Sequence, residues 1–312
     1  MTGETPIGRP VPGPVHRMWT TRHEPVMEVA DGDVVTFDAE ECSAGQLAGH
    51  VNGAEPPQLD YDLLYPLVGP ITVAGAEPGD AVELEILDYR PGTWGWTSVL
   101  PQFGLLEDDF PDYHVHRWEL QDGFADFLGA ARVPLRPFLG VMGATPDSDE
   151  PLSPFPPGHF GGNIDTRDLV AGTSVFLPVS TPGARVLLGD PHAAQGDGEV
   201  CGAAIEASLS GAIRIRLHKG RTIPAPQFST PGPLRTGIED RGYYATTGVA
   251  PDLMTASQDA VRAMIDHLVR ETGLAPLDAY VLCSVAVDLK ITEVVDRPNW
   301  VVAAYLPRSI LV

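Results

Sequence analysis

Basic side chains are scarce in this chain, and their scarcity limits the partners it can have. The 312 residues include 42 acidic residues against 20 Lys and Arg residues, which gives a formal net charge of −22, and only Lys219 and Lys290 are lysines. Binding to nucleic acid or to an anionic membrane needs clustered Lys and Arg side chains, so we expect neither partner. A small neutral or cationic ligand suits such a charge balance better.

Cysteines and long apolar runs are also few. The three cysteines, Cys42, Cys201 and Cys283, are far apart and odd in number, which argues against a disulfide framework. No apolar run approaches the ~20 residues that a membrane-spanning helix requires. Residues 1–19 are polar and proline-rich, unlike a secretory signal. The chain is therefore predicted to be cytoplasmic.

Several familiar binding and catalytic motifs are missing as well. The sequence contains no P-loop, no G-x-S-x-G elbow, no paired C-x-x-C motif and no EF-hand loop. These absences exclude P-loop nucleotide binding, an esterase of the nucleophile-elbow type, a zinc ribbon and an EF-hand calcium site.

Glycine (33 residues) and proline (31) are abundant, and they separate short runs in which apolar and polar residues alternate. Alternation with a period of two is typical of half-buried strands, which are predicted over 33–40, 70–75, 81–89, 173–180, 184–190 and 212–220. Pro78 and Gly79 favour a type II turn between the second and third of these. The apolar range 279–296 is predicted to be a buried strand that turns outward at Lys290.

One helix is predicted, over residues 255–273. Thr255 and Gln258 have the spacing of a capping box, and Gly273 supplies the C-terminal stop. An apolar stripe at helical spacing is predicted to face the core: Val261, Met264, Ile265 and Leu268. His267 lies outside the stripe and is expected to be exposed.

The predicted fold is mainly β, as packed sheets or distorted barrels, with one peripheral C-terminal helix. We expect residues 1–312 to form a single compact unit, with an N-terminal β part over 1–150 and a second part over 151–312 that holds the metal-binding loops and the helix. The proline-rich stretch 142–162 either joins two β units or forms a wall of the active site. Together with 222–250, it is expected to set the size of the pocket.

The densest collection of chemical groups lies at 189–206, in "GDPHAAQGDGEVCGAAIE". Pro191 favours extended geometry for the residue before it, and residues two apart in an extended chain share a face. Asp190 and His192 would then present the oxygen and nitrogen donors of half a zinc site. The pair Asp197 and Glu199 repeats this spacing.

A third donor must come from elsewhere, and "GGNIDT" at 161–166 offers Asn163 and Asp165. Each of these acids, taken alone, is also compatible with an ordinary solvated turn. Cys201 could act as a thiol nucleophile beside Glu199, but neither lysine is near it in the sequence, so a buried structural cysteine is favoured.

The same residues give the chain a resemblance to the acetamidase/formamidase family. Residues 161–206 are similar to that family's central segment, with G-G-N-x-D, a strand ending L-P-V, and G-D-x-H-A-x-Q-G-D-G-E. Residues 66–87, 43–47, 103–111 and 299–311 also resemble family elements, so nearly the whole chain is covered.

The resemblance, closest to the shorter acetamidase-like branch, implies hydrolysis of short aliphatic amides to a carboxylate and ammonia. It also implies a β-rich fold with a divalent metal, usually zinc. Carried over, Asp165, Asp190 and His192 fall on the metal positions, and Glu199 and Asp197 on the acids beside them.

Two positions depart from the family pattern, and whether either residue is a ligand stays open. A histidine often directly precedes G-G-N, whereas here Phe160 stands in that place and His159 is displaced by one. Glu41 occupies a position often filled by aspartate.

Amide hydrolysis needs an activated water and a proton for the leaving nitrogen. We assign Glu199 as the general base that moves this proton, with Asp197 as its partner or the alternative base; Glu199 as a metal ligand stays open. Asn163, Gln46 and Gln195 are expected to hold the substrate amide through complementary donors and acceptors.

Two other functions are compatible with the sequence: hydrolysis of a cyclic amide or carbamate, and non-catalytic binding of a small molecule. We also expect a homo-oligomer, with the apolar range 133–143 as a self-association surface. Trp94, Trp96 and 103–111 belong either to the core or to the pocket. In the pocket they would leave little room and give a graded preference for two- to three-carbon amides.

Overall fold

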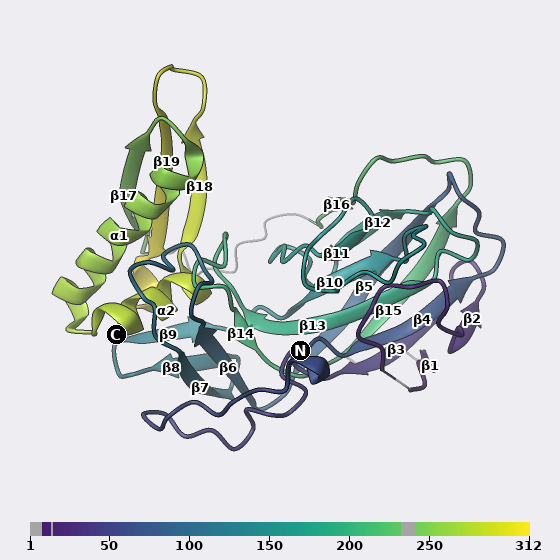
Figure 1. Ribbon diagram of the computed structural model, residues 1–312, viewed down its shortest axis with the longest axis horizontal. Coiled ribbons are helices and arrows are strands. Elements are labelled where there is room, and N and C mark those ends of the chain that lie inside the picture. Colours follow the sequence, from purple (N-terminus) through teal and green to yellow (C-terminus); the bar gives the residue numbers. More distant parts are fainter. Residues whose placement is uncertain (1–7, 14, 232–240) are drawn as a thin grey trace.

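Short strands are the main regular structure of the chain, as its glycine, proline and alternating residues predict (Figure 1). The computed structural model describes residues 8–13, 15–231 and 241–312, so the predicted loop 222–250 is described only in part. Among these residues, no helix is both long and apolar enough to cross a membrane.

A six-stranded sheet forms one end of the molecule. Its strands, in spatial order, are β1 (Arg9–Pro10), β3 (Val34–Ala39), β15 (Leu209–His218), β5 (Ala81–Pro91), β12 (Ser174–Pro178) and β16 (Gln227–Ser229). Four of them confirm strands predicted from alternation. Because β5 pairs with both β12 and β15, this sheet joins residues from before and after 150.

A ten-stranded sheet runs through the middle of the molecule. Its main path is β11 (Gly161–Asn163), β10 (Phe138–Ala144), β13 (Val186–Ala194), β14 (Ile205–Glu206), β6 (Trp94–Val99), β7 (His114–Gln121), β8 (Phe124–Phe127) and β9 (Ala131–Pro134). Two further strands join beside β13: β4 (Leu67–Val73) and β2 (Met27–Val29). Short 3-10 turns occupy Tyr61–Leu63 and Arg308–Ile310.

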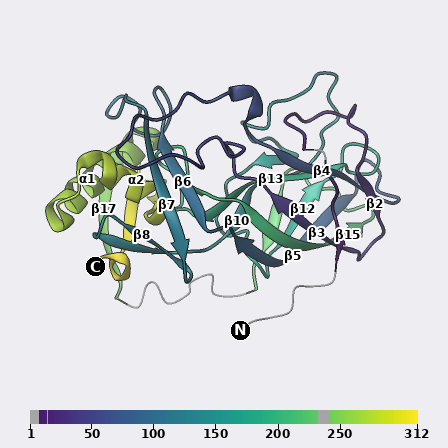
Figure 2. The same cartoon turned by 90° about the horizontal axis from the view of Figure 1, so that it is seen from below.

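The C-terminal residues form a separate three-stranded sheet with two helices, at the opposite end from the six-stranded sheet (Figures 1 and 2). The elements are β17 (Tyr243–Ala250), α1 (Leu253–Thr272), α2 (Pro276–Ala286), β18 (Asp288–Glu293) and β19 (Trp300–Pro307).

The prediction of a single helix is wrong, because α2 occupies the first half of the predicted strand 279–296. Every residue from Ala279 to Ala286 is buried, and a run that is apolar on all sides has no period that separates a strand from a helix. Pro276 at the start of α2 was the usable signal, since proline is favoured in the first helical turn.

Helix α1 confirms the predicted helix, with corrections at its start and on one face. Asp252, not Thr255, is the N-cap: its carboxylate accepts a hydrogen bond from the Thr255 backbone N–H at 2.8 Å. His267 is buried, not exposed, because its ring stacks on Tyr244 of β17 with centroids 3.5 Å apart. Gly273 ends the helix with a positive φ of 74°, as predicted.

Strand β13 belongs to both main hydrophobic cores. Val186 and Leu188 pack between the two large sheets, whereas Ala193 and Ala194 pack in the core formed with α1 and α2. The neighbouring strand β10 is buried along its whole length, so within the expected self-association surface 133–143 only residues 134–137 are partly exposed. The polar residues in the middle of β13 therefore lie at the junction of the two cores.

The predicted turn at Pro78 and Gly79 is confirmed, with Gly79 at a φ of +95°, and a buried carboxylate holds it. Asp80 is 5% exposed. Its carboxylate accepts hydrogen bonds from the Lys219 ammonium at 2.6 Å, the Gly220 N–H at 2.7 Å and the Glu77 N–H at 2.8 Å. The Lys219 hydrogen bond is the main reason that the pKa of Asp80 is lowered to about 2.

We predict that Asp80→Asn lowers the free energy of unfolding by about 2 kcal/mol at pH 7. A carboxylate with a lowered folded-state pKa stabilises the protein above its unfolded pKa, and this stabilisation is lost as pH falls from about 4 to about 2. Denaturant unfolding at several pH values should show wild type and variant converging near pH 2. The exposed Asp108, changed to Asn, is the control; a pH-independent difference for Asp80→Asn would contradict the prediction.

Candidate active site

Asp190 and His192 lie in the middle of β13, where its pairing with β10 is interrupted. Leu139 pairs with Pro191 and Val141 with Gly189, which leaves Asp190 opposite Gly140. Both side chains are buried: Asp190 is 3% exposed and His192 is 1% exposed. An acid and an imidazole are thus fixed on a rigid, buried strand.

The backbone that presents the acids is not extended, and on this point the sequence argument is wrong. Asp190, Asp165 and Glu199 all have positive φ, at 51°, 38° and 43°. This conformation costs a non-glycine residue roughly 1–2 kcal/mol. Three such residues at one place fit the general tendency of functional sites to hold strained backbone.

The structure nevertheless brings the predicted ligands together. The Nε2 atom of His192 lies 3.3 Å from Asp190 Oδ2 and 3.2 Å from Glu206 Oε2. Donor atoms of Asp165, Asp190 and His192 all lie within 4.8 Å of one another, and so do those of His192, Glu199 and Glu206. Four carboxyl groups therefore surround one imidazole.

The pKa directions in this cluster reflect crowded, buried charge. Burial, followed by the Asp190 charge, raises the pKa of Asp165 to about 6. Burial raises the pKa of Glu206 to about 8, and burial followed by the Asp165 charge raises that of Glu199 well above its usual value. Burial alone would lower the pKa of His192, but Glu206 and Asp190 together raise it. A positive charge is favoured at the centre of the cluster.

Gln195 fixes the orientation of His192. Its Oε1 lies 3.0 Å from His192 Nδ1, and its Nε2 donates to the Asp165 carbonyl at 2.8 Å. An amide oxygen can only accept, so Nδ1 carries a proton, and Nε2 is the ring atom that faces the carboxylates. Both ends of the Gln195 amide are engaged, which differs from the substrate contact predicted for it.

Glu206 and Cys42 belong to the cluster, and the sequence reasoning missed both. Glu206 is the cross-strand partner of His192 in the β13–β14 pair. A single acid after the apolar run "CGAAI" was the available signal for it. The Cys42 thiol lies within 4.8 Å of Asp190 and Glu206 donor atoms.

Two predicted site residues have other contacts. Asp197 is paired with the Arg167 guanidinium, with Asp197 Oδ1 3.2 Å from Arg167 Nε. Arg167 also binds Asp288, the first residue of β18. This network ties the loop to the C-terminal sheet. The Gln46 amide spans the Ser43 carbonyl and the Asp60 backbone, accepting from the Asp60 N–H at 2.7 Å. The Gln46 amide therefore holds this loop together.

The structure also places Asn163 and the three residues whose role stayed open, His159, Glu41 and Cys201. Asn163 lines a cavity beside the cluster. His159 is exposed and packs on the edge of Phe160. The buried Glu41 carboxylate accepts hydrogen bonds from Ser43, Gly45 and the Trp96 indole, so its oxygens are satisfied. Cys201 is fully buried and burial raises its pKa to about 12, which agrees with a structural cysteine.

The cluster fits a divalent cation. Within the described part of the chain, several of its buried polar atoms lack a hydrogen-bond partner: Asn163 Oδ1, Asp165 Oδ1, Asp190 Oδ1, His192 Nε2 and Glu206 Oε2. Gly140 leaves the space that they enclose, because a Cβ there would lie 2.4 Å from Asp165 Oδ1 and 2.8 Å from Asp190 Oδ2. Carboxylate oxygens and an imidazole nitrogen are donors that zinc and similar ions accept.

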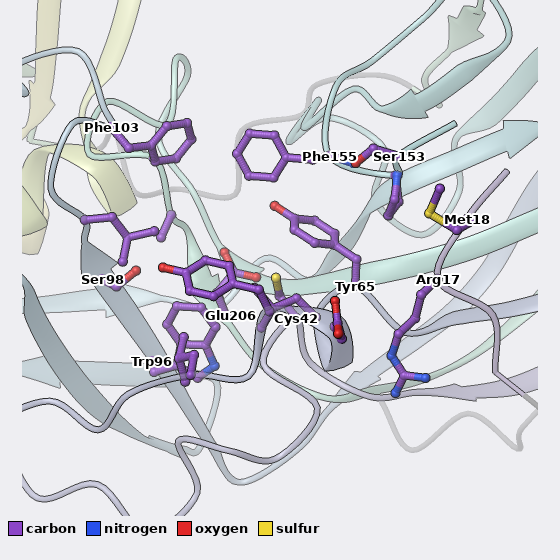
Figure 3. A pocket seen from close by; sticks show the side chains of 18 residues that line it. Arg17, Met18, Cys42, Tyr65, Trp96, Ser98, Phe103, Ser153, Phe155 and Glu206 are labelled. Carbon is purple, nitrogen blue, oxygen red and sulfur yellow. The ribbon is translucent and has the colours of Figure 1, made fainter. Parts of the chain in front are cut away.

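Two adjoining cavities meet at this cluster. Figure 3 shows the side chains that line the second of them. The first, here called the acidic pocket, has a volume of about 630 Å³ and is lined by Asn163, Asp165, Asp190, Glu199 and Glu206, among others. The second, here called the apolar chamber, has about 520 Å³. Prolines and Phe155 of the predicted loop 142–162 line both, so this loop is a wall of the site. The expected small pocket is not found, although Trp96 does line the chamber.

Comparison with known proteins gives consistent similarities. The model of the Acetamidase/Formamidase family matches residues 10–154 and 150–312. The formamidase of Methylophilus methylotrophus is 24% identical, over 96% of this chain and 89% of its own length. The acetamidase of Mycolicibacterium smegmatis is 27% identical over 67% of each chain.

Solved structures extend the likeness to the fold. A gamma lactamase from Delftia acidovorans superposes with a TM-score of 0.88 at 24% identity, over 95% of this chain and 89% of that one. An acetamidase from Bacillus halodurans superposes with a TM-score of 0.64 at 29% identity, over 94% of each chain. At 24% identity, the first likeness establishes a shared fold alone.

We predict that Gly140→Ala lowers divalent-metal affinity at least about tenfold, because the added methyl group displaces the Asp165 and Asp190 carboxylates. Metal content by mass spectrometry should fall while thermal unfolding changes little. Gly49→Ala is the matched control, since a Cβ there meets nothing within 4 Å. Unchanged metal affinity in Gly140→Ala would place the ion elsewhere.

Proposed function

Because the chain belongs to the acetamidase/formamidase family, we propose that it hydrolyses short aliphatic amides to a carboxylate and ammonia with a divalent metal ion, zinc. It is an amidohydrolase of linear amides, the activity for which its relatives are named. The observation that supports the metal dependence is the buried cluster around His192, where carboxylate and imidazole donor atoms lie within 4.8 Å of one another and several lack a hydrogen-bond partner in the described chain.

Asp165, Asp190 and His192 would hold the ion, and Glu206 is the fourth candidate because it faces the same imidazole nitrogen. A bound divalent ion supplies Lewis-acid chemistry, which polarises an amide carbonyl and makes water more acidic. Gln195 keeps His192 in the tautomer that a metal ligand needs, and such supporting contacts typically matter 10–100-fold for affinity.

Asn163 is suited to orient the substrate. Its Oδ1 is buried and faces the acidic pocket without a hydrogen-bond partner in the described chain, so it can accept a hydrogen bond from the substrate's amide N–H. Binding of a neutral amide satisfies this oxygen without adding negative charge to the cluster.

Glu199 is suited to move the proton. Its side chain lines the acidic pocket, and its carboxylate lies within 4.8 Å of donor atoms of His192 and Glu206, which places it at the edge of the cluster. As water attacks the carbonyl carbon, Glu199 takes a water proton and passes it to the nitrogen while the C–N bond breaks. The products are the carboxylic acid, which ionises, and ammonia.

We also propose that residues 1–312 act as one unit in the cytoplasm and as a homo-oligomer. The two large sheets share strands from both halves of the chain, which favours a single unit. Light scattering would measure the oligomeric state.

Purified protein is expected to release ammonia from formamide, acetamide and propionamide, as measured by an ammonia assay. Exhaustive treatment with a strong chelator should abolish this activity, and added zinc should restore it. Activity that survives complete metal removal would exclude the metal mechanism, and the same assay on Cys201→Ala would then test a thiol nucleophile.

Glu199→Gln is expected to lower kcat by about 10²–10⁴-fold, since it removes the proton carrier, while the metal content stays near that of wild type. Asp197→Asn is the matched control and should keep kcat within a few-fold, because Asp197 is paired with Arg167 away from the cluster. Loss of metal from Glu199→Gln would instead make Glu199 a ligand, and loss of activity in Asp197→Asn would make Asp197 the base.

A further inference from the structure

The apolar chamber is large compared with what a two-carbon amide needs. Its volume of about 520 Å³ is within the range of pockets that hold drug-sized ligands, roughly 300–1,000 Å³. Its walls include Leu59, Leu64, Tyr65, Trp96, Phe103 and Phe155. A molecule as small as acetamide, bound at the cluster, would leave this space filled with water against apolar walls.

Several polar groups in the chamber wall are already committed to the protein. The Trp96 indole N–H donates to Glu41, and the Ser98 carbonyl accepts from the Cys201 thiol. The Arg17 guanidinium donates to the Leu63 carbonyl at the rim. The interior therefore offers an incoming group mainly apolar and aromatic contact.

The chamber is continuous with the acidic pocket. Tyr65, Phe103, Phe155, Gly202 and Glu206 line both cavities. The Phe155 ring contacts those of Phe103 and Tyr65, with centroid distances of 5.3 and 5.6 Å. In Figure 3 these three rings lie above Glu206 and Cys42. A substrate whose amide lies at Glu206 can thus extend its acyl group between the aromatic walls.

We propose that the chamber binds the acyl part of the substrate, and that the preferred substrates are primary amides carrying a bulky apolar acyl group, such as an arylacetyl group. This rests on the proposed amidase function and deepens it. The amide nitrogen stays unsubstituted, since ammonia is the leaving group, so the bulk is on the carbonyl side. Leu64 is then a specificity residue, half-buried with its side chain on the chamber wall.

The test compares phenylacetamide with acetamide. Each methylene or ring carbon buried in an apolar site favours the larger substrate, so kcat/KM for phenylacetamide should exceed that for acetamide at least about tenfold. Leu64→Trp narrows the chamber at its wall and should reduce this advantage while acetamide turnover is kept. Leu63→Trp is the matched control, because the Leu63 side chain is 41% exposed and does not line the chamber.

The outcomes separate this inference from the function on which it rests. Turnover of acetamide with no advantage for phenylacetamide, or an advantage that Leu64→Trp leaves intact, overturns the chamber assignment and leaves the amidase function standing. If neither amide is turned over, the amidase proposal fails. Calorimetric titration with phenylacetamide then decides the chamber: binding that Leu64→Trp weakens tenfold supports it, and no binding overturns it.

Discussion

The repulsion among buried carboxyl groups is the interaction on which the rest of this site depends. Asp165, Asp190, Glu199 and Glu206 converge on the single imidazole of His192. Burying like charges together is costly, and the raised pKa values of Asp165 and Glu206 are a measure of that cost. A divalent cation bound among them would offset it. The crowding of buried carboxyl groups therefore supports the proposed metal site.

The fold supports this arrangement by placing Asp190 and His192 on a strand that is buried along its whole length. β13 lies in both hydrophobic cores, so Asp190 and His192 cannot relax away from one another. Gly140 of β10 leaves the necessary space, and Gln195 holds the imidazole. Asp197, in the loop after β13, pairs with Arg167, which also pairs with Asp288 of β18, so this loop is tied to the C-terminal sheet. Strain in three positive-φ acids is tolerated because the surrounding packing is extensive.

The two cavities divide the work of recognition by chemistry. The acidic pocket contains the charged and hydrogen-bonding groups, and the apolar chamber adjoins it across a shared set of aromatic walls. If the chamber binds the acyl group as proposed, reaction chemistry and acyl selectivity can vary separately, since residues such as Leu59 and Leu64 line the chamber and not the acidic pocket. A family of amidases could change substrates by changing these wall residues alone.

The sequence by itself determined the strand content, the turn at Pro78 and Gly79, the helix that ends at Gly273, and most of the residues in the cluster. These follow from local signals: alternation, turn residues, and unusual donors in one short segment. Only the tertiary structure decided that α2 is a helix. Its residues Ala279–Ala286 are buried on all sides, so their hydrophobic pattern has no period that separates a helix from a strand, and Pro276 was the one local signal.

The tertiary structure also decided that Glu206 and Cys42 lie in the cluster around His192 and that Asp197 and Gln46 bind other groups of the protein. The chamber, too, is formed only by the packing of distant segments. Cross-strand neighbours and cavities depend on how distant segments pack. Local sequence patterns do not indicate which distant segments come together. Glu206 and His192 are fourteen positions apart in sequence and meet only because β14 pairs with β13.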